Sequence, residues 1–228
     1  MALLAFDCSL RRFSAVLLDR RGAELGASRR GAGEWRGEEI VALLDELCRR
    51  HDRDWNALEA LAATVGPGSF TGVRTAVAVV RALALATGLP VHPVGTLEVL
   101  ASSVRERAGD RPLTAILPGK RGHLYFQPFA ADAVPLAAPA SVAAAELLPR
   151  IPAAAVVVTP EPEPLAALLG TRHEILEGAP DARAVALLAR RRRAAGERGL
   201  AGHRIEPLYL RAADADPRAG RPLVALAE

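Results

Sequence analysis

The order of elements in the first hundred residues constrains the fold more than any other feature of the sequence. Apolar and β-forming runs at 3–6, 13–18 and 23–29 are separated by short polar turns, which predicts three consecutive strands. The pattern then predicts, in order, a helix at 38–51, a strand ending at residue 65, a helix at 73–87, a strand at 90–94 and a helix at 96–104. A meander followed by strand–helix–strand crossovers requires a mixed sheet with helices on its faces.

This order is that of one lobe of the actin and sugar-kinase superfamily, which has a ribonuclease H-like core. We therefore predict an α/β protein with two lobes, each with a mixed sheet flanked by helices. A charged, turn-rich stretch at 105–111 predicts the boundary between a first lobe, 1–104, and a smaller second lobe, 105–204. Residues 214–228 are predicted to form a mobile tail. The elements predicted for the second lobe are strands at 113–117, 124–129 and 154–159 and helices at 142–148, 164–169 and 182–193.

The composition excludes several classes of protein. The chain has 228 residues, of which 50% are apolar and 24% charged, as is usual for a soluble globular protein. There is no run of about 18 apolar residues, so we expect no membrane span. The N-terminus lacks the basic and small-residue parts of a signal peptide, which indicates a cytoplasmic protein. The two cysteines and five histidines have no metal-ligand spacing, so no metal site is predicted, and a net charge of +3 does not by itself indicate nucleic-acid binding.

A glycine-rich turn before the helix at 73–87 is the strongest local signal. Glycines allow positive φ and close approach, Ser and Thr can cap the helix, and an arginine in the first turn can help to hold an anion. The turn lacks the Gly-Lys-Ser/Thr end of a Walker loop, so a tight structural turn is favoured over a phosphate site. The residues of this motif are Gly66, Gly68, Ser69, Thr71, Gly72 and Arg74.

A second candidate motif, Asp7 and Ser9, stands at the end of the first strand. In kinases of this fold an Asp at this place orients a metal-bound nucleotide, and small residues after it contact phosphate. Here Leu10 and two arginines follow Ser9, so a turn at the end of a strand is favoured. No catalytic residue is predicted, because no nucleophile stands beside a base in a recognisable pattern.

Two helices are predicted to carry a partner surface. The helix at 73–87 is apolar on nearly all sides, so either it is central in its lobe or its outer side docks on another chain. The helix at 38–51 has an apolar stripe and further apolar residues, Val41 and Ala42, beside it. The predicted surface comprises Ile40, Leu43, Leu44, Leu47, Val73, Val77, Val80, Arg81 and Leu83.

Four consecutive arginines, Arg190 to Arg193, end the last predicted helix. A solvated helix end that complements the helix dipole is the simpler interpretation. The alternative is contact with RNA phosphates. That alternative is weakened because no aromatic residues are interleaved with the arginines.

Several motifs resemble the TsaB family, also called YeaZ, of bacterial tRNA threonylcarbamoyladenosine biosynthesis. The resemblance covers about residues 2–104 and a short terminal segment, and it implies that residues 205–213 complete the first lobe. The acid that the family has before Tyr125 and the His that it has before the first helix are missing. The matching stretches are Leu4–Ser9, Gly66–Arg74, Ala82–Leu85, Gly88–Pro90, Gly95–Glu98 and Pro207–Arg211.

The resemblance implies a non-catalytic subunit. Family members form a heterodimer with TsaD, a homologous subunit that binds metal and nucleotide and transfers the threonylcarbamoyl group to adenosine 37 of tRNAs that decode codons starting with A. A P-loop ATPase, TsaE, joins the complex, so ATP and metal are expected on the partner subunits and tRNA is expected as an indirect partner. Pairing uses the first two helices of the first lobe, and an isolated chain could form a homodimer through them.

Three other functions remain as alternatives. An ATP-dependent phosphotransferase or transferase of this superfamily, acting alone, would use Asp7, Ser9 and the glycine turn. A peptidase lacks its nucleophile–base pair in this sequence. An RNA-binding module would use Arg190 to Arg193 and would bind with a steep dependence on salt.

Overall fold

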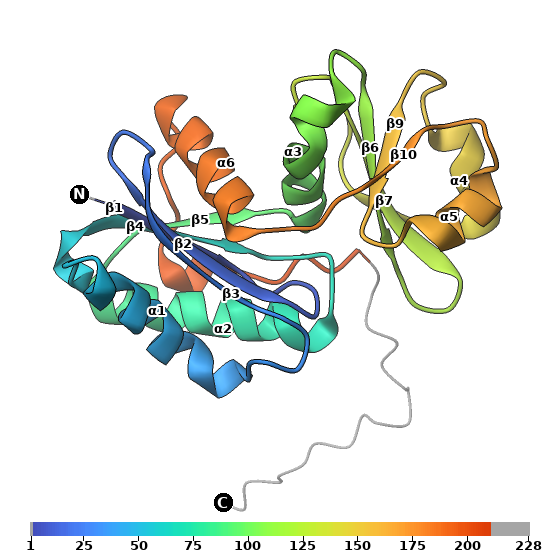
Figure 1. Ribbon diagram of the computed structural model, residues 1–228. Coiled ribbons are helices and arrows are strands. Elements are labelled where there is room, and N and C mark those ends of the chain that lie inside the picture. The colour runs from blue at the N-terminus through green and yellow to red at the C-terminus, as the bar shows by residue number, and fades with distance from the viewer. Residues whose placement is uncertain (1, 211–228) are drawn as a thin grey trace, which may run out of the picture.

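The computed structural model describes residues 2–210, which form two lobes built on two five-stranded mixed sheets. Helices cover both faces of each sheet, and the two lobes lie side by side (Figure 1). The fold class predicted from the order of the elements is confirmed.

The first sheet has the strand order β3-β2-β1-β4-β5, in which β1 pairs with β2 antiparallel and with β4 parallel. Every residue of the central strand β1 is buried, because helices cover both of its faces. The parallel pairing places the ends of β1 and β4 at the same edge of the sheet. The strands are β1 (Ala2–Asp7), β2 (Phe13–Asp19), β3 (Glu24–Arg30), β4 (Leu58–Thr64) and β5 (Val91–Val94).

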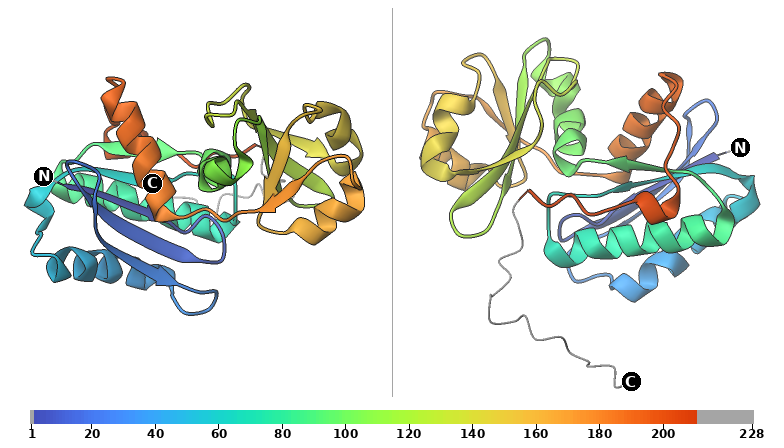
Figure 2. Two further views of the ribbon diagram at one scale, coloured as in Figure 1. Left: turned by 45° about the horizontal axis from the view of Figure 1, so that its top comes forward. Right: turned by 180° about the vertical axis from the view of Figure 1, so that it is seen from behind.

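The helices α1 (Ile40–Arg50) and α2 (Phe70–Thr87) lie next to each other on one face of this sheet, and α6 (Ala182–Ala194) packs on the other (Figures 1 and 2). The alternation of side chains along β1 supplies both cores, since Leu4 belongs to the α1 and α2 side and Leu3 to the α6 side. Short 3-10 turns precede α1 and β4 at Gly37–Glu39 and Trp55–Ala57.

The second sheet has the order β10-β9-β6-β7-β8. The helix α3 (Thr96–Ala108) covers one face, and α4 (Ala144–Leu147) and α5 (Pro162–Leu169) cover the other. A 3-10 turn, Leu148–Arg150, follows α4. The strands are β6 (Leu113–Pro118), β7 (His123–Phe129), β8 (Ala140–Ala143), β9 (Val156–Thr159) and β10 (Ile175–Glu177).

The predicted division into lobes needs a correction. The helix α6 falls inside the stretch assigned to the second lobe, but its apolar side packs on the first sheet. The helix α3, assigned to the first lobe, packs mainly on the second sheet and also contacts α6, so it lies between the lobes (Figure 2). The first lobe is thus built from two separate stretches of sequence, and a single boundary along the chain does not divide the lobes.

Three elements also differ from the predicted pattern. Residues 142 and 143, predicted as the start of a helix, form the end of β8, because residues 140–143 pair with β7 at the edge of the sheet. The three-residue strand β10 is too short to show a period in the sequence. The helix α2 begins at Phe70, three residues before its predicted start, since Ser69 caps its N-terminus.

After α6 the chain runs back along the first lobe. Leu200 pairs with Val91 of β5 through two backbone hydrogen bonds of 2.8 and 2.9 Å. A 3-10 turn, Gly202–Arg204, contacts α2, and Ile205 is buried in the core beneath it. The backbone N–H of Leu208 then donates to the carbonyl of Val65 at 2.7 Å. Residues 211–213 of the predicted terminal segment and the predicted tail lie outside the described residues.

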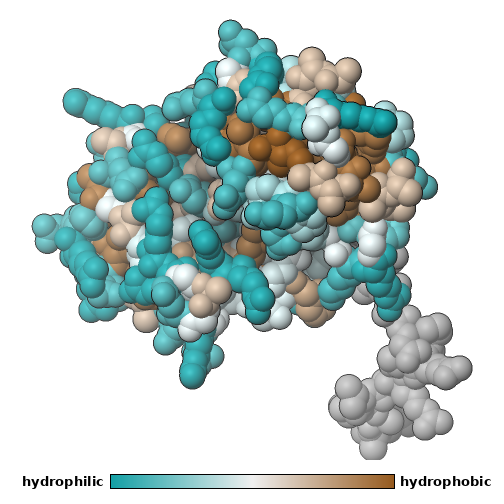
Figure 3. All heavy atoms as spheres, turned by 45° about the vertical axis from the view of Figure 1, so that its right-hand side comes forward, coloured by the Kyte–Doolittle hydropathy of each residue, from teal (hydrophilic) through white to brown (hydrophobic). Residues whose placement is uncertain are grey.

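The helix α2 has the length and mean hydropathy of a membrane-spanning segment, although none was expected from the sequence. Seven of its residues are buried against the first sheet, as in the core helix of a folded lobe. Figure 3 shows that hydrophilic residues cover much of one face of the molecule and that hydrophobic residues gather toward its upper right. The second lobe also has exposed large apolar side chains, at Val134, Leu136 and Leu168.

Candidate functional site

The carboxyl group of Asp7, at the end of β1, is enclosed by polar groups of its own lobe. Its Oδ1 accepts hydrogen bonds from Ser9 N at 3.1 Å, Ser9 Oγ at 2.6 Å and Thr64 Oγ1 at 2.6 Å. Only 2% of Asp7 is exposed, and this burial raises the pKa of its carboxyl above the ordinary value despite the hydrogen bonds. These bonds tie Asp7 to the ends of β1 and β4.

The glycine-rich turn packs directly on the backbone that follows Asp7. A Cβ atom on Gly68 would lie 2.3 Å from Ser9 O, and one on Gly72 would lie 2.1 Å from Cys8 O. Ser69 N donates to Ser9 O at 2.7 Å, and Cys8 Sγ donates to Gly72 O at 3.4 Å. The glycines therefore allow two segments of the same chain to touch, which no larger residue permits.

Gly66 links the same turn to two further segments. Its φ of +109° lies in the region that favours glycine. Its carbonyl accepts from Thr96 N, the first residue of α3, at 2.8 Å, and a Cβ atom on it would lie 2.9 Å from Leu208 O. The turn is thus a packed joint between β4, α3 and the returning C-terminal segment.

The structure brings the two sequence motifs together, because β1 and β4 are parallel neighbours in the sheet. The space between them is filled by their own backbones and by the hydroxyls of Ser9 and Thr64. Ser69 Oγ caps α2 by accepting from Gly72 N at 3.4 Å, while Thr71 is exposed. This arrangement fits a structural joint better than a pocket for phosphate.

The described residues offer no other obvious catalytic group. Among residues 2–210 no group of three or more His, Cys, Asp or Glu side chains is placed to hold a metal ion. Both cysteines are buried, which raises the pKa of Cys48 to about 11 and that of Cys8 still further. Both thiols are protonated at neutral pH, and a protonated thiol is a poor nucleophile.

Most residues predicted for the partner surface lie in the core, which corrects the prediction. The helices do lie side by side, but their strongest apolar stripes face the first sheet and not solvent. Leu43 is partly buried and Arg81 is exposed. The seven that belong to the core are Ile40, Leu44, Leu47, Val73, Val77, Val80 and Leu83.

A different set of residues forms the outer side of the two helices. The described part of the chain exposes small apolar side chains along α2, together with Leu85, which is 87% exposed. A hollow of about 460 Å³ lies beside Leu85, between the end of α2 and the turn at Gly202. We call this surface the α1–α2 face; its residues are Val41, Ala42, Ala78, Arg81, Ala82, Leu85 and Ala86.

The four consecutive arginines are tied to other segments of the chain. Arg191 bonds Asp132 of the second lobe through both its carbonyl and its carboxylate, at 3.0 and 3.3 Å. Arg192 donates to Pro93 O at 2.7 Å and forms an ion pair with Glu98 of α3. The prediction of a solvated helix end thus holds for Arg191, which stays exposed, but not for Arg192, which is partly buried between β5 and α3.

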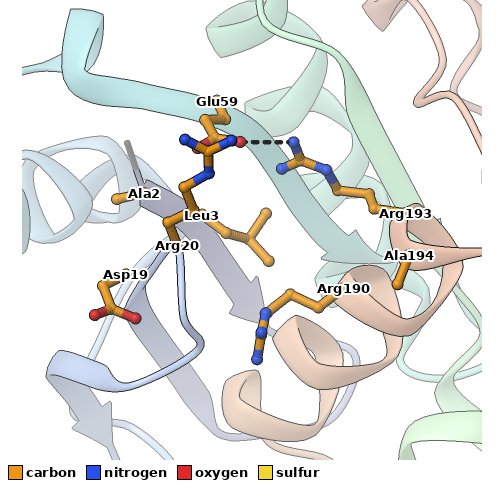
Figure 4. A pocket seen from close by; sticks show the side chains of 8 residues that line it. All are labelled: Ala2, Leu3, Asp19, Arg20, Glu59, Arg190, Arg193 and Ala194. Atoms are coloured by element: carbon orange, nitrogen blue, oxygen red, sulfur yellow. Dashed lines mark hydrogen bonds and ion pairs between the residues drawn. The ribbon is translucent and has the colours of Figure 1, made fainter.

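The remaining two arginines border an open hollow of about 410 Å³ near the start of β1. Figure 4 shows Arg193 reaching Glu59, to which it bonds at 2.8 Å, and Arg190 pointing away from Glu59. Arg190 donates to Arg21 O at 2.9 Å. These bonds hold α6 to the start of β4 and to the turn after β2. The four arginines therefore use much of their hydrogen-bonding capacity within the protein.

One exposed cluster was not predicted. Phe70 and Tyr209, with Arg74 between them, lie at the N-terminal end of α2 beside Lys120 of the second lobe. Applying the N-cap rule to Ser69 would have placed Phe70 in the first turn of the helix. Nothing in the sequence places Tyr209 beside it, since their contact is a tertiary one.

A protein-family model matches more than half of the chain. The model describes TsaD, the tRNA N6-adenosine threonylcarbamoyltransferase, and it matches residues 35–152. The match runs from the loop before α1 to the end of the 3-10 turn after α4. It thus includes the glycine turn, α1 and α2.

Curated relatives with the name tRNA threonylcarbamoyladenosine biosynthesis protein TsaB match the chain over shorter stretches. The protein of Haemophilus influenzae is 31% identical over 126 residues, which are 55% of this chain and 52% of the relative. The protein of Bacillus subtilis is 35% identical over 68 residues, 30% of this chain and 29% of the relative. The aligned part therefore spans about half the length of the first of these relatives.

Solved structures extend the likeness of fold to nearly the whole chain. YeaZ from Pseudomonas aeruginosa has a TM-score of 0.81 at 24% identity and covers 92% of this chain and 99% of its own. The activator of 2-hydroxyisocaproyl-CoA dehydratase from Clostridium difficile has a TM-score of 0.51 at 10% identity, covering 86% of this chain and 97% of its own. At these identities the likeness shows the fold alone.

Proposed function

Because the chain belongs to the TsaB/YeaZ family, within the wider group that the TsaD model describes, we propose that it is a non-catalytic subunit in tRNA threonylcarbamoyladenosine biosynthesis. It acts by forming a heterodimer with a TsaD-type subunit and supporting that subunit. ATP and metal are bound by the partners, a TsaE-type P-loop ATPase joins the larger complex, and tRNA is modified by the partner.

The observation that carries this proposal is the α1–α2 face. Its α2 residues are Ala78, Ala82, Leu85 and Ala86, on a helix whose opposite side is already buried in the core. Small side chains let a second helix approach closely, and Leu85 offers a large apolar group to a pocket on a partner. Exposed apolar surface that is rimmed by charge is typical of protein–protein contact.

The joint at the glycine turn supports a non-catalytic role. Asp7 and the turn are the residues that an enzyme of this fold would use, and here they bond to each other's segments. A phosphate between them would have to displace the contact of Gly68 with Ser9. A phosphotransferase acting alone would nevertheless be recognised by metal-dependent ATP turnover of the isolated chain, which we expect to be absent.

The decisive experiment mixes this chain with its TsaD-type partner and measures complex formation by size-exclusion chromatography with light scattering. We expect a heterodimer for the wild type. Ala82→Glu and Leu85→Glu place a charge on the α1–α2 face and should weaken the heterodimer at least tenfold, since a buried unpaired charge costs several kcal/mol. Both positions are exposed, so the variants should fold normally.

Leu187→Glu is the matched control, because Leu187 is an exposed leucine on α6, on the other side of the sheet. It should leave the heterodimer unchanged. Heterodimers of wild-type affinity from both α2 variants would refute the placement of the interface. If the wild type neither binds the partner nor stimulates tRNA modification by it, the proposed function itself fails. A homodimer of the isolated chain that Leu85→Glu disrupts would show that both assemblies use one face.

A further inference from the structure

All nine aromatic residues of the chain lie within the described residues. Of these nine, only Phe70 and Tyr209 are exposed. Phe70 is 45% exposed and Tyr209 is 49% exposed. The two rings are neighbours, with centroids 6.4 Å apart, although they are separated by most of the second lobe in the sequence. A chain with few aromatic residues thus places its two exposed rings together.

Two cations accompany the rings. The guanidinium carbon of Arg74 lies 3.6 Å from the centroid of Phe70 and 5.8 Å from that of Tyr209, and its Nε donates to Tyr209 Oη at 2.8 Å. The ammonium of Lys120 lies 5.5 Å from the centroid of Phe70. The cluster therefore joins the first turn of α2, the turn between β6 and β7, and the returning C-terminal segment.

The cluster carries two positive charges, on Arg74 and Lys120. Among the described residues, no carboxylate forms an ion pair or hydrogen bond with Arg74 or Lys120. Many other arginines of the chain are paired with carboxylates, as Arg191 is with Asp132. Within the part of the chain that the structure describes, Arg74 and Lys120 thus have no acidic partner, and their positive charges can attract an anionic ligand.

The packing of the glycine turn leaves the side chains of Phe70 and Arg74 on the outer side of the motif. The backbone of the turn is directed inward onto Ser9 and Cys8 by the close contacts of Gly68 and Gly72. The motif exposes Thr71, the ring of Phe70 and, one turn further, the guanidinium of Arg74. The glycines of the motif make the packing contacts, whereas Phe70 and Arg74 place an aromatic ring beside a cation at the surface.

We propose that this cluster, Phe70, Arg74, Lys120 and Tyr209, binds an unpaired stretch of RNA. The guanidinium of Arg74 covers one face of the Phe70 ring, so bases stack on the ring surface that stays open. The two cations lie where phosphates of the same strand can reach them. The inference rests on the proposed function, in which a tRNA is the substrate of the complex, and it adds a direct contact by this chain. An unpaired strand is favoured because duplex RNA keeps its bases stacked on each other.

The test measures binding of the full chain to a fluorescein-labelled RNA of about 12 unpaired nucleotides by fluorescence anisotropy, with the same sequence as a duplex for comparison. We expect the unpaired strand to bind more tightly than the duplex. Phe70→Leu keeps an apolar side chain but removes the ring, and should weaken binding roughly tenfold, whereas Phe70→Trp should retain it. Arg74→Gln and Lys120→Gln should each weaken binding and lower the salt slope by about 0.7.

Arg105→Gln and Leu136→Ala are the controls, since both residues are exposed and lie outside the cluster. They should bind RNA like the wild type. Undetectable binding, equal affinity for the duplex, or wild-type affinity of Phe70→Leu would each overturn the proposal. Formation of the heterodimer is also measured for each variant. If Phe70→Leu no longer binds the partner subunit but binds RNA like the wild type, the cluster is a protein contact instead. Failure of RNA binding with an intact, stimulating heterodimer would leave the proposed function standing.

Discussion

Asp7 and Gly72 illustrate how single residues hold the first lobe together. One oxygen of Asp7 accepts three hydrogen bonds, and burial nevertheless raises the pKa of its carboxyl above the ordinary value of 3.8. A carboxyl whose pKa is raised by folding contributes stability that is present below the unfolded pKa and is lost as the pH rises through the folded pKa. At neutral pH an ionised Asp7 is therefore a cost to stability.

Replacing Asp7 by Asn separates the hydrogen bonds from the cost of burying the charge. The amide oxygen keeps the hydrogen-bond acceptor, and the charge is removed. We expect Asp7→Asn to raise the free energy of unfolding at pH 7, measured by urea denaturation. The gain over the wild type should shrink as the pH falls, because protonation of Asp7 removes the charge that burial disfavours. Asp7→Ala should lose about 2–4 kcal/mol, since it leaves the donors of Ser9 and Thr64 without their buried acceptor. A less stable Asn variant at pH 7 would mean that the hydrogen bonds outweigh burial.

Gly72 tests the close contact of the turn with β1. Gly72→Ala would put a Cβ atom 2.1 Å from Cys8 O, a backbone atom that cannot move freely. We expect a loss of about 1–3 kcal/mol in the free energy of unfolding, despite the better helix propensity of alanine. Gly31→Ala is the control, because its Cβ atom meets only the end of the Glu34 side chain, and its effect should stay within about 0.5 kcal/mol. Equal stability of the two variants would contradict the packed joint.

At the scale of elements, the sequence correctly predicted the helix α2, but it did not predict which residues of α2 face outward. The helix is apolar on nearly all sides, so periodicity could not separate the seven residues in the core from the exposed Ala78, Ala82 and Leu85. The same ambiguity made the core residue Val80 a candidate for the partner surface. Only the position of the sheet decides which apolar side of such a helix is inside.

The helix α6 shows the opposite case, in which local signals were sufficient. Asp181, a residue type that often caps helices, stands directly before the predicted helix start and accepts from Ala184 N at 3.0 Å. Its carboxylate also forms an ion pair of 3.5 Å with Arg29 of β3. We expect Asp181→Ala to lose about 1 kcal/mol of unfolding free energy, as is usual for the loss of a capping side chain. Asp181→Asn keeps the cap but not the charge and should lose less. Urea denaturation of the two variants side by side measures the difference, and equal losses would assign the effect to the ion pair.

At the scale of the whole molecule, the return of the chain after α6 buries His92 of β5. Desolvation lowers the pKa of its imidazole; the charges of Arg193 and Arg192 also lower it, and Glu197 raises it. A Cβ atom on Gly199 would lie only 3.1 Å from His92 Nε2, so the returning segment packs against the imidazole. The neutral imidazole is therefore the form that the folded protein holds.

A histidine whose pKa is lowered by folding contributes stability that is present above its unfolded value, about 6.5, and is lost as the pH falls through the folded value. We expect Tm to drop between pH 7.5 and pH 5.5 partly for this reason. His92→Gln, which cannot be protonated, should show a smaller drop over the same range in a thermal shift measurement. His173, which is only partly buried in the second lobe, supplies the control: His173→Gln should fall as the wild type does.

The sequence by itself determined the order of elements in the first hundred residues and the mixed character of the first sheet. These follow from local chemistry: strand-forming runs, capping residues and the parallel crossover that brings neighbouring strand ends to one edge. The tertiary structure alone decided where α6 packs, which apolar residues of α1 and α2 are covered, what the four arginines bind, and that Phe70 meets Tyr209. Each of these depends on contacts between segments far apart in the chain, and such contacts leave no period or spacing in the sequence.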